Sequence, residues 1–177
     1  MKTILIIFTS IFLVSCGKML EPFDKIIHKK ETDPRQFTKS NPIFSNHIFE
    51  FEKKFYYSKN RNIRVSNIPV NFGNTNDDGN SSTIGICYSW SNGDREIIIN
   101  KKWWDSQNDC NRQVLINHEL GHCALGRDHK NNKLNGHKLS IMNKYHLDGD
   151  SYCENEDEYD HELFTHDHSL LEEIFNF

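Results

Sequence analysis

The sequence predicts an α+β fold in which one small sheet follows a first helix and precedes a second. Apolar side chains recur at near-helical spacing after Pro42, and again between residues 114 and 125. Between these segments, two runs of alternating apolar residues flank an Asn-Gly dipeptide at 92–93, which is a strong signal for a hairpin turn. The 177 residues suit one domain of ordinary size together with a targeting segment.

The targeting segment is the apolar run at the N-terminus. Lys2 precedes this run, which is too short to span a bilayer as a permanent helix and ends in Leu13-Val14-Ser15-Cys16. That ending resembles the signal of bacterial lipoproteins, in which the chain is cut before the cysteine and the cysteine carries the lipid, such as palmitate. The resemblance implies a signal peptide over 1–15 and a lipid on Cys16 that anchors the protein to a membrane of the cell envelope. Because no Asp follows Cys16, it points to the outer membrane. An ordinary secretory signal with an incidental cysteine is the alternative.

The rest of the chain divides into a tether and a folded domain. Residues 16–41 contain two prolines, several lysines and little regular pattern, so we expect a tether that leads from the membrane to a domain over 42–177. That domain is predicted to open with a helix from Pro42 to about Tyr57. Its apolar stripe belongs to the core and consists of Ile48, Phe49, Phe51, Phe55 and Tyr56.

Three strands are predicted after this helix. Residues 62–72 alternate in polarity, although Pro69 favours an edge strand or a break. Residues 83–90 and 95–100 are predicted to pair antiparallel across the Asn-Gly turn.

The second helix carries the chemical signal of the chain. It is predicted to begin near Asn108 or Asp109 and to end at Gly126 in a left-handed C-cap. Within it lies His118-Glu119-Leu120-Gly121-His122. Residues four apart share one face of a helix, so both histidines can direct a ring nitrogen at one ion. Glu119 lies beside that face, where it can act as a base on water without being a ligand. A surface helix that carries two histidines by chance is the alternative, in a chain with 10 His.

A third ligand is expected just past this helix. His129 follows the turn at Gly126, and a third nitrogen there would leave the fourth zinc position open. An open position distinguishes a catalytic zinc site from a structural one. The sequence therefore predicts zinc as the cofactor, with His118, His122 and His129 as its ligands.

The residues that follow extend the motif. Gly126-x-x-His129 comes first, and Ser140-Ile141-Met142 follows a polar loop. Together with His-Glu-x-x-His, these segments resemble the metzincin metalloendopeptidases, and their matrixin-like members most closely. The resemblance covers residues 118–142 and implies Glu119 as the general base and Met142 in a tight turn beneath the zinc. It also implies the metzincin architecture, in which a small twisted mixed sheet carries a packed helix, followed by the zinc helix, the Met-turn and a C-terminal helix.

The sequence departs from the family pattern in two places. The family has Gly three and His six residues after the second motif histidine, whereas Gly126 and His129 come one residue later. The extra residue adds about 100° of rotation and 1.5 Å of rise, which the turn must absorb. Asp128 keeps the family spacing and is the alternative third ligand, because some metzincins use aspartate. Some members also have a tyrosine two residues after the methionine that contacts the zinc or the oxyanion. Tyr145 is three residues after Met142, and either takes that role or serves packing.

Four cysteines remain once Cys16 is assigned to the lipid: Cys87, Cys110, Cys123 and Cys153. An even number in an exported chain predicts up to two disulfides, with three connectivities open. A bridge from Cys110 or Cys123 would attach the motif helix to a strand or to the C-terminal segment.

Charge is distributed unevenly along the chain. The net charge is −4, but residues 148–177 carry 11 acidic side chains and no Lys or Arg, which leaves 21 Lys and Arg against 14 acidic side chains elsewhere. No interleaving of aromatic and basic residues accompanies this excess, so no nucleic-acid partner is expected. The acidic segment is interpreted as a solvated C-terminal helix from Glu154 onward.

These features predict a monomeric zinc-dependent endopeptidase that acts on peptide or protein substrates at a bacterial membrane. Residues 95–100 are expected to form an edge strand that pairs with an extended peptide. The alternative is a non-catalytic zinc-binding lipoprotein that serves as a binding or structural module, for which Glu119 is unnecessary. A third hypothesis is a gluzincin-like peptidase in which a distant glutamate, such as Glu154, is the third ligand.

Overall fold

The computed structural model describes residues 26–30, 32–76 and 82–176, so the signal peptide and Cys16 lie outside the described residues. Its sheet has the strand order β1 (Ile27–Lys29), β3 (Gly85–Trp90), β4 (Arg95–Ile99) and β2 (Val70–Phe72). Strands β3 and β4 are antiparallel, whereas β1 and β2 run parallel to their neighbours. The predicted α+β class with a small mixed sheet is confirmed, and so is the antiparallel hairpin.

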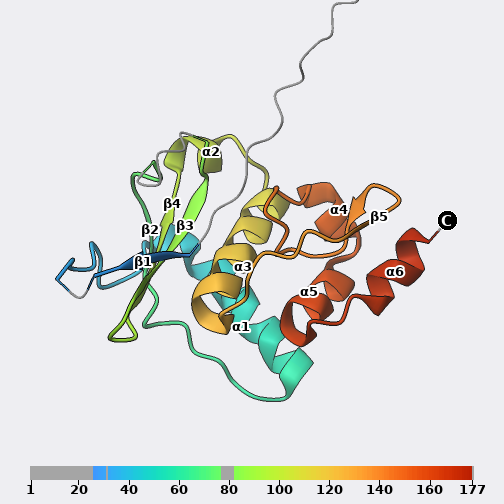
Figure 1. Ribbon diagram of the computed structural model, residues 1–177, viewed down its shortest axis with the longest axis horizontal. Helices are drawn as coiled ribbons and strands as arrows, with labels where there is room; N and C mark the ends of the chain where they lie inside the picture. Colours follow the sequence, from blue (N-terminus) through green and yellow to red (C-terminus); the bar gives the residue numbers. More distant parts are fainter. Residues whose placement is uncertain (1–25, 31, 77–81, 177) are drawn as a thin grey trace, which may run out of the picture.

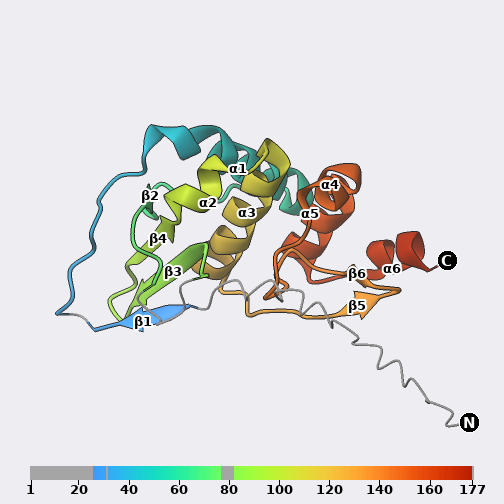
Figure 2. The same cartoon turned by 90° about the horizontal axis from the view of Figure 1, so that it is seen from above.

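Helix α3 (Asp109–Leu125) lies between the sheet on one side and helices α4 to α6 on the other (Figure 1, Figure 2). It contacts β3, β4, α1 and α4. The remaining elements are a 3₁₀ turn (Pro42–Phe44), α1 (Ser45–Lys59), α2 (Lys101–Asp105), β5 (Lys133–Leu134), β6 (His137–Lys138), α4 (Gly149–Glu154), α5 (Glu156–Thr165) and α6 (Ser169–Phe175). The chain thus ends in three short helices, where the sequence predicts one. Among the described residues, no helix combines the length and the apolar character needed to cross a bilayer.

The ends of α3 are set by local sequence. The Asn108 side chain caps the N-terminus by accepting a hydrogen bond from the Asn111 main-chain N–H at 2.9 Å. At the other end, Gly126 adopts a left-handed conformation with φ of 66°. The main-chain N–H groups of Gly126 and Arg127 then donate to the carbonyls of His122 and Gly121. Both predicted ends of the motif helix are confirmed, and the chain leaves α3 in a turn that leads directly to His129.

Both faces of the sheet are buried. The larger apolar cluster fills the space between the sheet and the helices, and includes Phe51, Phe55, Leu115 and Leu163. The second cluster, on the outer face, consists of Ile86, Tyr88, Trp90 and Ile98, and is packed by Ile27 and Phe37. Because side chains alternate along a strand, the same strand β3 also sends Cys87 to the inner face.

The outer cluster is covered by residues 26–30 and 32–41, a segment that the sequence assigns to the tether. The Gln36 main-chain N–H donates to the buried Glu96 carboxylate at 2.8 Å, and the Trp90 indole N–H donates to the Asp33 carbonyl. The Asn41 main-chain N–H donates to the Val70 carbonyl at 2.9 Å. The folded unit therefore begins before residue 42.

One strand prediction is confirmed only in part, since β2 is the edge strand that Pro69 favours but is shorter than predicted, and another is wrong. Residues 62–72 form a strand only at Val70–Phe72, because Val65 to Ile68 make a turn closed by a main-chain hydrogen bond of 2.8 Å. The strand at 95–100 is not an edge strand, since β4 lies between β3 and β2. The sheet edge beside β3 is occupied by β1, which pairs with residues 88–90.

Two disulfides attach α3 to its surroundings. Cys87–Cys123 joins it to β3, with 5.6 Å between the Cα atoms, and Cys110–Cys153 joins it to α4, with 6.0 Å. The prediction of two disulfides is confirmed, and one of the three connectivities is selected. The motif helix is held covalently on both sides.

Removing the Cys110–Cys153 bridge by the double substitution Cys110→Ser and Cys153→Ser is expected to lower the free energy of unfolding by about 3–4 kcal/mol, because the bridge closes a long loop of the unfolded chain. Denaturant unfolding without reductant measures this change. Equal midpoints for the parent and the variant would contradict the expectation.

Candidate metal centre

Three histidine side chains meet beside the C-terminal half of α3. The Nε2 atoms of His118 and His122 lie 3.1 Å apart, and the Nε2 atom of His129 lies 3.2 Å from that of His122. One nitrogen from each ring falls within 4.8 Å of the other two. His118 and His122 are buried, whereas His129 is half-buried, so the group opens toward solvent on the His129 side.

The two helix histidines have defined proton positions. His118 Nδ1 is 2.8 Å from the Ile141 carbonyl, and His122 Nδ1 is 2.5 Å from the Arg127 carbonyl. A carbonyl oxygen can only accept, so each Nδ1 carries the proton and donates it. In a neutral ring, Nε2 then holds a lone pair, and these lone pairs face the centre of the group.

The environment keeps both rings neutral. Burial lowers the pKa of His118 well below its ordinary value, and the neighbouring His122 lowers it further. Burial also lowers the pKa of His122 to about 4, and the pKa of His129 is lowered for the same reason. Neutral imidazoles are the form that binds metal ions, so no proton needs to leave these rings at neutral pH.

This arrangement fits a metal ion. Nitrogens bound to zinc at 2.0–2.1 Å in tetrahedral geometry lie roughly 3.3 Å from one another. The two Nε2 separations of 3.1 and 3.2 Å are close to that value. Converging lone pairs repel one another unless a cation lies between them, which also favours metal binding. The three histidines could therefore hold a metal ion, with one tetrahedral position left for another ligand.

The alternative ligands lie apart from this group. Asp128 is exposed, and its charge opposes the lowering of the His122 and His129 pKa values. Glu154 is exposed at the end of α4. Among the described residues, the group that could hold a metal contains neither carboxylate. Tyr145 is half-buried, and the Lys144 ammonium lies 5.0 Å from the centre of its ring.

Glu119 lies next to His118 on α3 and is fully buried. Its carboxylate is packed against the first residue of β3. A Cβ atom added to Gly85 would lie 2.4 Å from Glu119 Oε1, a distance that real contacts do not reach. Glycine at position 85 therefore leaves the room that the Glu119 side chain occupies, and the sequence contains no local signal for this contact.

Met142 packs against α3 at Gly121. A Cβ atom on Gly121 would lie 2.4 Å from Met142 Sδ, so the thioether touches α3 one residue before His122. Met142 is fully buried, and its carbonyl accepts a hydrogen bond of 2.7 Å from the Lys130 main-chain N–H. The segment after His129 is thereby held against the turn that contains Met142.

The structure also contains a buried ion pair, between Arg127 and Glu162, that the sequence does not indicate. Arg127 Nη2 lies 2.7 Å from Glu162 Oε1, and both side chains are almost completely buried. Ser140 Oγ donates to the other Glu162 oxygen, Oε2, at 2.7 Å. The three residues are far apart in the chain and carry no periodic pattern, so only the folded structure brings them together.

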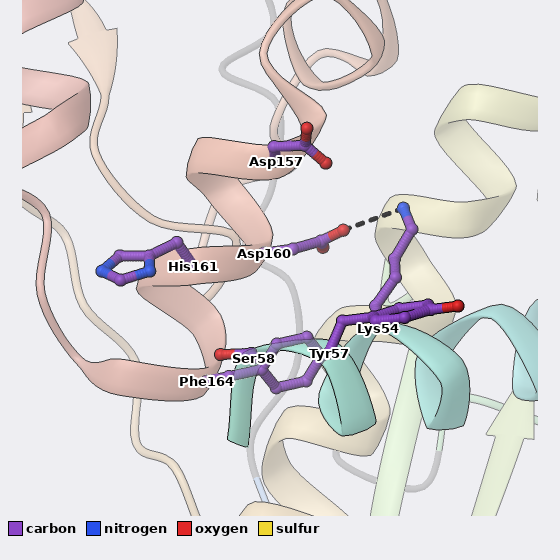
Figure 3. Close-up of a pocket in the computed structure, with 7 residues that line it drawn as sticks. All are labelled: Lys54, Tyr57, Ser58, Asp157, Asp160, His161 and Phe164. Carbon is purple, nitrogen blue, oxygen red and sulfur yellow. Dashed lines mark ion pairs between the residues drawn. The ribbon is translucent and has the colours of Figure 1, made fainter. Parts of the chain in front are cut away.

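A surface pocket of about 440 Å³ lies elsewhere, between α1 and α5 (Figure 3). Its lining includes Lys54 and Asp160, which form an ion pair of 2.8 Å, together with Tyr57 and Phe164. None of the three clustered histidines lines this pocket. It is therefore separate from the candidate metal centre.

Comparison of the chain with protein-family models, with curated proteins and with solved structures finds no match. Any assignment of function must therefore come from the chemistry of the site.

In the metal-free protein, stability is expected to fall as the pH falls from about 6.5 to about 4. His122 has an ordinary pKa of 6.5 and a folded-state pKa of about 4. Between these values the unfolded chain binds a proton that the folded protein does not, which costs about 2–3 kcal/mol at the acid end of the range. Urea unfolding of chelator-treated protein measures the loss. A His122→Gln variant isolates this group, and equal losses in the parent and the variant would contradict the assignment.

Proposed function

We propose that this protein is a zinc-dependent endopeptidase of the metzincin type, held at a bacterial membrane by a lipid on Cys16. The observation that carries the proposal is the convergence of three histidine nitrogens, two of which belong to the helix that also carries the buried Glu119. A purely structural zinc site has no use for Glu119, whereas hydrolysis requires a base at this position.

The surroundings of the histidines support the metzincin assignment in particular. Met142 lies in a turn packed under α3 at Gly121, as the resemblance implies for the Met-turn. The zinc helix packs on a small mixed sheet, and short helices follow the turn.

The chain supplies both the metal ligands and the base. His118, His122 and His129 would bind the ion through Nε2, and the bonds from Nδ1 to main-chain carbonyls hold the first two rings in orientation. When bound, zinc polarises the scissile carbonyl and makes water acidic enough to attack at neutral pH. Glu119 accepts the proton of the attacking water and transfers it to the leaving amine. Substrate would approach from the half-buried His129 side.

The substitution Glu119→Gln is expected to retain zinc and to lower peptide hydrolysis by about 10²–10⁴-fold, because it removes only the proton acceptor. Zinc content and cleavage of a peptide mixture, followed by mass spectrometry, measure the two properties separately. The matched control is His118→Ala, which should lose zinc as well as activity.

Two outcomes would count against this mechanism. Full hydrolysis by zinc-loaded Glu119→Gln would remove Glu119 from its role. A parent protein that bound zinc and cleaved no peptide would favour the non-catalytic zinc-binding lipoprotein.

The substitution Gly85→Ala is expected to lower kcat by on the order of 10²-fold while zinc remains bound, because the added Cβ displaces the Glu119 carboxylate from the strand. Steady-state kinetics together with zinc analysis test this expectation. Ser89→Ala, on the same strand, is the control and should retain activity. Unchanged kcat in Gly85→Ala would show that the position of Glu119 does not depend on this contact.

A further inference from the structure

We propose that Glu162 on α5 is a positioning residue that orients both helix histidines of the metal centre from behind. The inference rests on the proposed metal site and deepens it. Glu162 is fully buried, and each of its carboxylate oxygens leads, through one intermediate residue, to the main-chain carbonyl that holds one histidine ring.

The first branch leads to His122. Glu162 Oε1 pairs with Arg127 Nη2 at 2.7 Å, while Arg127 Nη1 donates to the Glu162 and Leu163 carbonyls at 2.8 and 2.7 Å. The Arg127 side chain is thus attached to α5 by three charge-assisted bonds. The carbonyl of the same residue accepts the Nδ1 proton of His122. Fixing the guanidinium therefore fixes the acceptor that sets the angle of the His122 ring.

The second branch leads to His118. Glu162 Oε2 accepts from Ser140 Oγ at 2.7 Å, and Ser140 Oγ accepts in turn from the Met142 main-chain N–H at 3.0 Å. The residue between them, Ile141, provides the carbonyl that accepts from His118 Nδ1. Through these two hydrogen bonds, the Ser140 hydroxyl holds the turn that carries the Ile141 carbonyl.

Side-chain bonds are needed because both acceptors belong to irregular segments. Arg127 follows the C-cap of α3, and Ile141 lies in a turn outside the sheet, so neither carbonyl is fixed by a helix or a strand ladder. A buried ion pair is weak evidence for stability, since apolar residues of similar volume often replace it without loss. The Glu162 carboxylate is connected to both carbonyls through Arg127 and Ser140. We therefore assign its buried charge a role in positioning these carbonyls rather than in stability.

The test measures metal affinity and ligand geometry without relying on hydrolysis. Zinc affinity is obtained by chelator competition, and the visible absorption of the Co²⁺-loaded protein reports the ligand geometry. Glu162→Gln and Ser140→Ala are each expected to weaken zinc binding by about tenfold and to change the Co²⁺ spectrum. Zinc affinity within about twofold of the parent in both variants, with unchanged spectra, would overturn the proposal.

The matched control is Asp160→Asn. Asp160 is a buried carboxylate on the same helix, and it pairs with Lys54 of α1 at 2.8 Å. It also accepts a hydrogen bond of 3.3 Å from the Asn117 amide of α3, which an amide oxygen at position 160 can still accept. This variant should lose stability and keep the zinc affinity of the parent. If Asp160→Asn and Glu162→Gln weakened zinc binding equally, the loss of affinity would come from general destabilisation, and the proposal would be overturned.

A double variant covers the case in which Glu162→Gln does not fold. Arg127→Met with Glu162→Leu removes both charges of the buried pair together. Lys130, which lies 3.5 Å from Glu162 Oε1, is half-buried and keeps its bond to the His166 carbonyl. We expect cooperative unfolding with zinc binding still about tenfold weaker. Parent-like zinc binding in this folded variant would overturn the positioning role. A parent that bound metal and cleaved no peptide would overturn the proposed peptidase and leave this inference standing, whereas a parent that bound no metal would overturn both.

Discussion

The burial of helix α3 is the constraint on which the rest of the structure depends. Every residue of α3 from Gln113 to Cys123 is buried, because the sheet, α1 and the C-terminal helices enclose it. A helix in this position cannot leave polar side chains to water, so each one needs a partner within the protein. Gln113 and Asn117 find theirs in a chain of hydrogen bonds from His47 to Tyr152 and Asp160. The histidines find theirs in main-chain carbonyls.

The same burial accounts for the chemistry of the candidate site. Desolvation lowers the pKa of both helix histidines, and the carbonyl acceptors fix which nitrogen carries the proton. Desolvation also acts on Asp160 of α5. Burial raises the pKa of its carboxyl to about 6, although the nearby Lys54 lowers it. Burial therefore prepares the histidines as neutral ligands without any additional device. What remains is to set their angles, which is the role that Arg127, Ser140 and Glu162 fulfil.

Local sequence patterns predicted the parts of the structure that depend on local physics. The spacing of His118 and His122, the Asn108 cap, the Gly126 turn and the hairpin at Gly93 each follow from helix or turn geometry within a few residues. The parts that local patterns did not predict depend on contacts between residues that are far apart in the sequence. Strand β1 pairs with β3 across some 60 residues of sequence, and no pattern near Ile27 indicates this. In the same way, Gly85 gives no local sign that it faces Glu119.

The extra residue between His122 and Gly126 is the least predictable part of the motif, and it leads directly to the buried pair of Arg127 and Glu162. One added position lengthens the last turn of α3, and the left-handed Gly126 redirects the chain there. Arg127 then lies where its N–H bonds the Gly121 carbonyl, its carbonyl holds His122, and its side chain reaches Glu162. A short polar residue at 127 could make the main-chain contacts but could not reach α5. The turn after Gly126 is therefore held to α5 by the Arg127 side chain, and His129, rather than Asp128, meets the two helix histidines beyond this turn.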